Sequence, residues 1–174
     1  MASPRTGKRA TTDVRVTTLA RTPLAASGVA RLAAAVLRAE GAELAALSIT
    51  FVGPARIRSL NRLHLGRDRE TDVIAFAMGG PADGRTGGRS GRRPPDRPTA
   101  RPPLVADIYI CPSIATREAK RAGTTVKDEV RRLVVHGVLH ALGYDHPAGA
   151  ARRLASPMWR RQERHVRAHG GLAR

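Results

Sequence analysis

Short apolar segments alternate with helical patterns along this chain of 174 residues. Four segments rich in apolar or β-branched residues predict strands: residues 14–21, 47–53, 71–78 and 104–113. Apolar and polar positions alternate in the first segment, which is typical of an edge strand. We expect the four strands to share one sheet.

Apolar residues at helical spacing, bounded by Pro and Gly, predict four helices: residues 27–41, 54–66, 112–122 and 125–143. The last of these has the longest helical pattern in the chain. Thr124 or Thr125 is its expected N-cap, and Gly143 is its expected stop. Residues 148–169 then predict one or two basic helices, interrupted before Pro157.

Residues 79–103 interrupt this pattern with Gly, Pro, Arg and small polar residues. Such a segment cannot bury enough apolar area to offset its ordering entropy, so we expect a disordered insertion. Its six Arg and two Asp leave two interpretations open, a mobile electrostatic arm or an insertion without function. The length suits a single domain over residues 1–174.

A net charge of +17 and a pI of about 11.8 favour a polyanionic partner, RNA or DNA, although an Arg-rich composition also follows from GC-rich coding. Cys111 is the one cysteine, which excludes a disulfide within the chain. The first residues lack the apolar core of a secretory signal, and no apolar run reaches the roughly 20 residues that cross a bilayer. We therefore expect a cytoplasmic protein without a membrane partner.

Candidate chemistry is concentrated in "HGVLHALGYDH", residues 136–146. His136 and His140 are four residues apart, so they lie on one face of the predicted helix, and their Nε2 atoms can converge on one ion. Gly143 lets the chain reverse so that His146 can supply a third nitrogen. Three histidine ligands favour one zinc ion per chain, with the fourth position open for water or substrate as in catalytic sites. Nickel, copper and iron also accept imidazole.

Two other interpretations of these histidines remain. The side chains can be satisfied by backbone carbonyls or line a cleft without a metal ion. The spacing H-x-x-x-H-x-x-G-x-x-H is also that of metzincin peptidases, but Gly137 stands where those enzymes have the Glu that acts as general base. A peptidase is therefore the less favoured alternative.

The same motif resembles, residue for residue, the H-G-x-L-H-x-x-G-Y-D-H signature of the YbeY family of bacterial rRNA maturation factors. "LNRLHLGRDRETDVIAF" (60–76) is similar to that family's "LN…RGKDKPTDVLSF" segment, and "ADIYICPSIATREAK" (106–120) is similar to its "GDIVI" strand and the following helix. The resemblance covers roughly residues 45–165.

This resemblance implies a zincin-like α+β domain with a small, mostly parallel mixed sheet of about four strands, several helices and a zinc-binding helix near the C-terminus. It implies a zinc-dependent endoribonuclease that is specific for single-stranded RNA, matures the 3′ end of 16S rRNA and acts in ribosome quality control on the small subunit. His136, His140 and His146 would be the zinc ligands.

The chain departs from the family at the position of an Arg that contacts phosphate, where it has Leu65. Arg67 either takes over this role or is a solvated surface residue. Ala75 and Ala77 replace a Ser and a Pro of the family, which predicts altered packing or pocket polarity.

Six further residues near these motifs have predicted roles. Asp72 caps a turn or accepts a hydrogen bond from a ligand ring. Tyr144 and Asp145 shape the turn between the ligands, or Asp145 tunes water at the metal. Trp159, beside Met158, packs in the core, and Cys111 is a small buried apolar residue.

No residue of the sequence stands out as a general base, so attack by water and attack by the RNA 2′-hydroxyl both remain open. Two alternatives accompany the nuclease hypothesis: a zinc-bearing ribosome assembly factor with little intrinsic nuclease activity, and the metzincin-like peptidase. The oligomeric state is left open.

Overall fold

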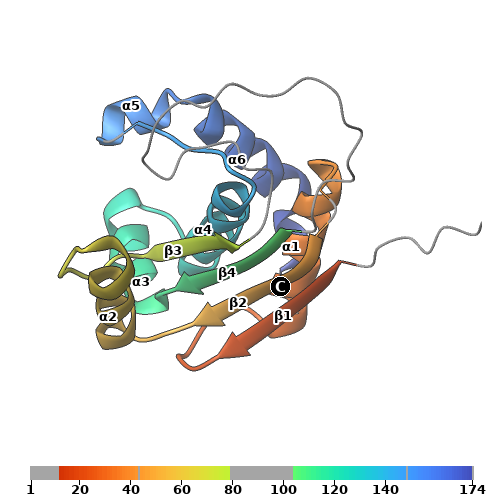
Figure 1. Ribbon diagram of the computed structural model, residues 1–174. Coiled ribbons are helices and arrows are strands. Elements are labelled where there is room, and N and C mark those ends of the chain that lie inside the picture. The colour runs from red at the N-terminus through yellow and green to blue at the C-terminus, as the bar shows by residue number, and fades with distance from the viewer. Residues whose placement is uncertain (1–11, 43, 79–103, 148, 174) are drawn as a thin grey trace, which may run out of the picture.

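The computed structural model describes residues 12–42, 44–78, 104–147 and 149–173 (Figure 1). The elements follow in the order β1 (Asp13–Thr18), α1 (Ala26–Ala39), β2 (Leu44–Phe51), α2 (Pro54–Leu65), β3 (Val73–Met78), β4 (Leu104–Ile110), α3 (Pro112–Ala122), α4 (Val126–Ala141), α5 (Ala150–Leu154), α6 (Pro157–His169) and the short 3-10 turn η1 (Gly170–Leu172). The expected insertion at 79–103 lies outside the described residues.

The four strands form one mixed sheet in the order β1-β2-β4-β3. β1 pairs with β2 and β2 pairs with β4 in parallel, whereas β3 pairs with β4 antiparallel. β1 lies at an edge, as its alternating pattern predicts. The α+β class and the mostly parallel mixed sheet of four strands are confirmed.

Proline and glycine set the helix boundaries close to where the sequence places them. Pro54 and Pro112 occupy the first turns of α2 and α3, where a missing backbone N–H costs nothing. Gly66 and Gly123 end these helices in the left-handed conformation, at φ 66° and 64°. Thr125 caps α4 by accepting a hydrogen bond from the Asp128 backbone N–H at 3.1 Å.

α4 is the central helix of the main core. It contacts β3 and β4 on one side and α1, α3 and α6 on others, so in Figure 1 it lies directly behind the sheet. Gly137 is the point of closest approach, because a Cβ atom there would lie 2.7 Å from Ile108 Cγ2 of β4. With Val134, Val135, Val138 and Leu139 fully buried, α4 is held rigidly enough to fix the side chains on its remaining face.

A second apolar cluster lies where α2 meets the sheet. It joins Ile57 and Leu60 of α2 to Ile74 of β3, and it contains Cys111, which is fully buried as expected. Within the part of the chain that the structure describes, no helix is both long and apolar enough to cross a membrane.

Candidate metal centre

The turn after α4 brings the third histidine back toward the other two. α4 ends at Ala141 with Leu142 as its C-cap, and Gly143 adopts φ 87°, a conformation that favours glycine. The Tyr144 backbone N–H donates to the Leu139 carbonyl at 3.0 Å, which closes the turn. The Asp145 carboxylate accepts from the His146 backbone N–H at 2.7 Å. Asp145 therefore shapes the turn, which is one of the two roles predicted for it.

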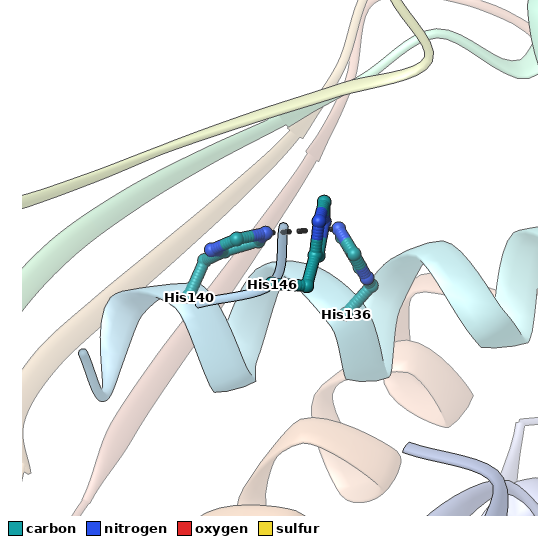
Figure 2. Close-up of side chains that lie close together, drawn as sticks. All are labelled: His136, His140 and His146. Atoms are coloured by element: carbon teal, nitrogen blue, oxygen red, sulfur yellow. Dashed lines mark hydrogen bonds between the residues drawn. The ribbon is translucent and has the colours of Figure 1, made fainter. Parts of the chain in front are cut away.

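His136, His140 and His146 point toward one another from α4 and this turn (Figure 2). Their ring centroids are 4.5 to 5.2 Å apart, and one nitrogen from each ring lies within 4.8 Å of the others. The Nε2 atoms of His136 and His140 are 3.0 Å apart. Within the described ranges, this is the one group of three His, Cys, Asp or Glu side chains arranged to hold a metal ion.

The hydrogen bonds behind the rings fit such an ion. The Pro147 carbonyl can only accept, so His146 donates to it from Nδ1 at 3.2 Å, and this hydrogen bond selects the tautomer whose Nε2 can bind a metal ion. Gln162 Oε1 lies 2.7 Å from His136 Nδ1, which likewise leaves Nε2 of that ring as the free lone pair. Two of the three rings are therefore set to present Nε2.

The orientation of the Gln162 amide follows from its other neighbour. Gln162 Nε2 donates to Glu163 Oε1 at 3.3 Å, and the same oxygen accepts from Arg132 Nε at 2.9 Å. Because a carboxylate only accepts, the amide nitrogen faces Glu163 and the amide oxygen faces His136. We name Arg132, Glu163 and Gln162 the outer chain of the site. These three residues were not among those predicted from the sequence.

Burial favours the neutral form of two of the rings, His136 and His140. Desolvation lowers the pKa of His136, although the hydrogen bond that the ring donates to Gln162 acts in the opposite direction. Desolvation lowers the pKa of His140 to about 4, and charge repulsion from His136 and His146 acts in the same direction. Neutral imidazole is the form that binds a metal ion. At neutral pH these two rings therefore need not be deprotonated before a metal ion binds.

A polar cluster around Glu40 anchors the turn that follows α4. Glu40, at the end of α1, accepts from the Tyr144 hydroxyl and from Arg161 at 2.7 Å each, and its other oxygen lies 2.6 Å from His165 Nε2. Burial raises the pKa of the Glu40 carboxyl, but the hydrogen bonds from Tyr144, His165 and Arg161 outweigh this effect and leave the pKa below its usual value. Tyr144 thereby ties the turn that carries His146 to α1 and α6.

A cavity of about 820 Å³ opens beside His136. Trp159 and Gln162 line this cavity. Its wall also carries four basic and four acidic side chains: Arg69, Arg121, Arg132, Arg153, Glu70, Asp72, Glu118 and Glu129. Arg121 pairs with Glu118, and Arg132 pairs with Glu129 and Glu163. Arg69 and Arg153 form no side-chain hydrogen bond or ion pair with any residue that the structure describes, so both guanidinium groups are available to an anion.

Glu129 is a largely enclosed carboxylate of this wall, with its side chain 16% exposed. Desolvation raises its pKa, and the neighbouring Arg132 opposes this shift only in part. Glu129 and His136 are seven residues apart on α4, hence on one face, with about 10 Å of helix between them. At that separation the carboxylate does not contact the three rings.

The two Arg residues after α2 have different positions. Arg67 is exposed and does not line the cavity, whereas Arg69 does. Asn61 holds this loop, because its carbonyl accepts from the Arg67 backbone N–H at 3.2 Å and its amide donates to the Arg69 carbonyl at 2.8 Å. The role predicted for Arg67 stays a prediction.

Asp72 accepts from the Val73 backbone N–H at 2.9 Å and from the Thr71 hydroxyl at 3.1 Å, which is the capping role. The acceptor at His136 Nδ1 is Gln162 instead. Met158 is buried in the main core as expected. The core position predicted for Trp159 is wrong: successive residues of a helix point in different directions, and Trp159 is half-buried on the cavity wall.

Known proteins resemble this chain over most of its length. A family profile described as Endoribonuclease YbeY matches residues 15–170. A protein named Endoribonuclease YbeY from Pelotomaculum thermopropionicum is 37% identical over 147 residues, which cover 83% of this chain and 85% of the relative. Two others of that name, from Anaeromyxobacter sp. and Methylocella silvestris, are 39% identical, but the chain spans only 56% and 54% of their lengths.

A solved structure supports the fold. The solution structure of a Thermotoga maritima protein superposes with a TM-score of 0.56 at 22% identity, covering 91% of this chain and 89% of that one. At this identity the likeness concerns the fold alone.

Proposed function

Because this chain belongs to the YbeY family, we propose that it is a zinc-dependent endoribonuclease that cuts single-stranded RNA, with 16S rRNA in the small ribosomal subunit as its target. One observation carries the proposal. Three histidine rings converge beside a cavity on whose wall two guanidinium groups have no partner among the described residues. A metal site next to unpaired cations suits a phosphodiester substrate.

His136, His140 and His146 are the proposed zinc ligands, one ion per chain. Three neutral imidazole nitrogens are a common donor set for catalytic zinc. When bound, such an ion supplies Lewis acidity to the phosphodiester and to water. The surrounding residues orient the rings: Gln162 fixes His136, and the Pro147 carbonyl fixes His146.

Arg69 and Arg153 are the proposed phosphate contacts. Both line the cavity whose wall also includes His136. Their guanidinium groups neutralise charge that develops on the non-bridging oxygens in the transition state. Arg67 is the alternative from the sequence, and comparing Arg67→Ala with Arg69→Ala separates the two.

The hydrogen bonds of the three rings involve an amide, a carbonyl and each other, and no carboxylate of the described residues. Two nucleophiles are compatible with this site, a water molecule and the neighbouring RNA 2′-hydroxyl. End-group analysis distinguishes the two routes, because a 2′,3′-cyclic phosphate on the product marks attack by the neighbouring hydroxyl.

A peptidase of the metzincin type is disfavoured by position 137. Those enzymes have a Glu base directly after the first histidine, and here that position faces β4, where a Cβ atom would lie 2.7 Å from Ile108 Cγ2. A base at this position would meet the sheet and not the site.

The test combines metal analysis with RNA cleavage. We expect about one zinc per wild-type chain by mass spectrometry, and loss of both zinc and single-strand cleavage in His136→Ala and His140→Ala. Chelation should abolish cleavage and added zinc should restore it. The matched control is His64→Ala, because His64 is exposed and its ring contacts Phe76 outside the cluster.

Two outcomes would contradict the proposal. Cleavage that survives metal loss would exclude a metal-dependent mechanism. Zinc retained without any metal-dependent cleavage would favour an assembly factor, and a ligand variant that still bound the small subunit tightly would support that role.

A further inference from the structure

We propose that Trp159 is a stacking platform for one unpaired base of the RNA, so that the cavity beside His136 holds a whole nucleotide. The inference rests on the proposed function. It assigns the base to Trp159 and the adjoining phosphate to Arg153 and Arg69.

Trp159 is placed firmly at the start of α6. Its backbone N–H donates to the Ser156 Oγ cap at 3.1 Å, and the neighbouring Met158 is 3% exposed and anchored in the main core. Gln162, one turn further along, is the residue bonded to His136. Trp159 and Gln162 line the same cavity, so the indole is fixed on a wall that leads directly to the candidate ligands.

The indole of Trp159 makes no aromatic, cation–π or hydrogen-bonding contact with the described residues. Among the described residues, no ring stacks on Trp159, no cation lies over it, and its indole N–H makes no hydrogen bond. No buried side-chain nitrogen or oxygen of the described residues lacks a partner, so this N–H is open to solvent. A core tryptophan normally finds a partner for its N–H; one that presents its ring to a polar cavity is available to a ligand.

The charges around Trp159 favour a nucleotide. Arg153 and Arg69 line the cavity without partners in the described part of the chain. Trp159 thus lines one cavity together with two guanidinium groups that have no partner among the described residues. An aromatic ring combined with cations is the arrangement by which single-stranded nucleic acids are bound without sequence preference, the base on the ring and the phosphates on the cations. Unpaired RNA exposes its base faces, whereas a duplex does not.

Because Trp159 is the only tryptophan of the chain, its fluorescence reports on this wall alone. The zinc-loaded protein is titrated with a short single-stranded RNA that carries 2′-O-methyl groups throughout, and gel analysis checks that the RNA stays intact. Anisotropy of a dye on the RNA measures binding independently. We expect quenching of Trp159 and protection from iodide in parallel with binding. Binding without either change would overturn the proposal.

Substitution gives the second arm. Stacking on an aromatic side chain contributes enough that Trp159→Ala should weaken RNA binding about 5- to 150-fold, while Trp159→Phe should restore most of it. Zinc content and thermal midpoint, unchanged in both variants, serve as folding controls. If Phe and Ala are equally weak, the ring acts through packing and the stacking role is wrong.

An abasic RNA completes a double-mutant cycle. Removing the base that stacks on Trp159 should cost the wild type as much as Trp159→Ala does, and should cost the Ala variant almost nothing further. A scan of the abasic position along the RNA locates that base. If the wild type cleaves single-stranded RNA but no abasic position couples to Trp159, the stacking proposal fails alone. If the wild type neither binds nor cleaves RNA, the proposed function fails with it.

Discussion

The amide of Gln162 is the most consequential contact behind the candidate metal site. Its oxygen accepts from His136 Nδ1 at 2.7 Å, and its side chain is 2% exposed. In Gln162→Leu the volume is nearly kept, but His136 loses the acceptor that selects its Nδ1–H tautomer. The ring is then free to carry its proton on Nε2, where the metal would bind.

The size of the effect follows from these contacts. Loss of an outer hydrogen-bond partner typically lowers metal affinity about 10- to 100-fold, or about 1.4 to 2.7 kcal/mol. A buried N–H left without an acceptor also lowers the free energy of unfolding by about 1 to 3 kcal/mol. We therefore expect Gln162→Leu to fold less stably and to bind zinc at least about tenfold more weakly.

Competition with a chromophoric chelator measures the zinc affinity, and urea denaturation measures the stability. Nitrogen NMR of the metal-free protein reads the tautomer directly: His136 should be Nδ1-protonated in the wild type and mixed in the variant. Glu163→Gln is the graded comparison, since it releases the amide of Gln162 without removing it. Unchanged zinc affinity together with an unchanged tautomer in Gln162→Leu would refute the reasoning.

Three further predictions concern other parts of the molecule. The pKa of Glu40 is lowered in the folded state, so its contribution to stability is present above about pH 4.5 and is lost as the pH falls through the folded pKa. The free energy of unfolding of Glu40→Gln should therefore depend less on pH over that range in urea titrations, and an identical pH dependence would contradict this. Gly137→Ala should lower the free energy of unfolding by about 1 to 3 kcal/mol, because its Cβ would meet Ile108 at 2.7 Å, and an equally stable variant would show that β4 yields easily. Arg69→Ala should raise KM for RNA and reduce the salt dependence of log K by about 0.7 per lost phosphate contact, more than Arg67→Ala does, and the reverse order would assign the contact to Arg67.

The elements of the fold could be predicted because their signals are local. Pro54 and Gly66 bound α2 within a dozen residues, and Thr125 caps α4 from the adjacent position. The edge position of β1 follows from its alternation. The pairing partner of each strand does not follow in the same way, because β3 is antiparallel to β4 through contacts that the local pattern does not encode.

The three candidate ligands belong to the same class of local signal. His136 and His140 are one turn apart on a helix, and Gly143 supplies the reversal that returns His146, so eleven consecutive residues contain the geometry. The cavity wall is different. Arg69 reaches it from the loop after α2 and Arg153 from α5, and their convergence depends on the packing of the whole domain.

The residues that orient the ligands lie far away in the sequence: Gln162 is 26 residues from His136, and Glu40 is 104 residues from Tyr144. One signal for them existed. The buried positions of α6 are Met158, Gln162 and His165, a helical spacing in which two of three side chains are polar. A polar side chain on the buried face of a helix needs a partner. Here Gln162 contacts the candidate ligand His136, and His165 contacts Glu40, which holds the turn through Tyr144. The Arg residues of α6 obscure this pattern in the sequence, because they are typical of a basic helix that is exposed to solvent. The buried face of a strongly basic helix is thus worth reading separately, since its polar positions mark where the helix contacts a functional centre.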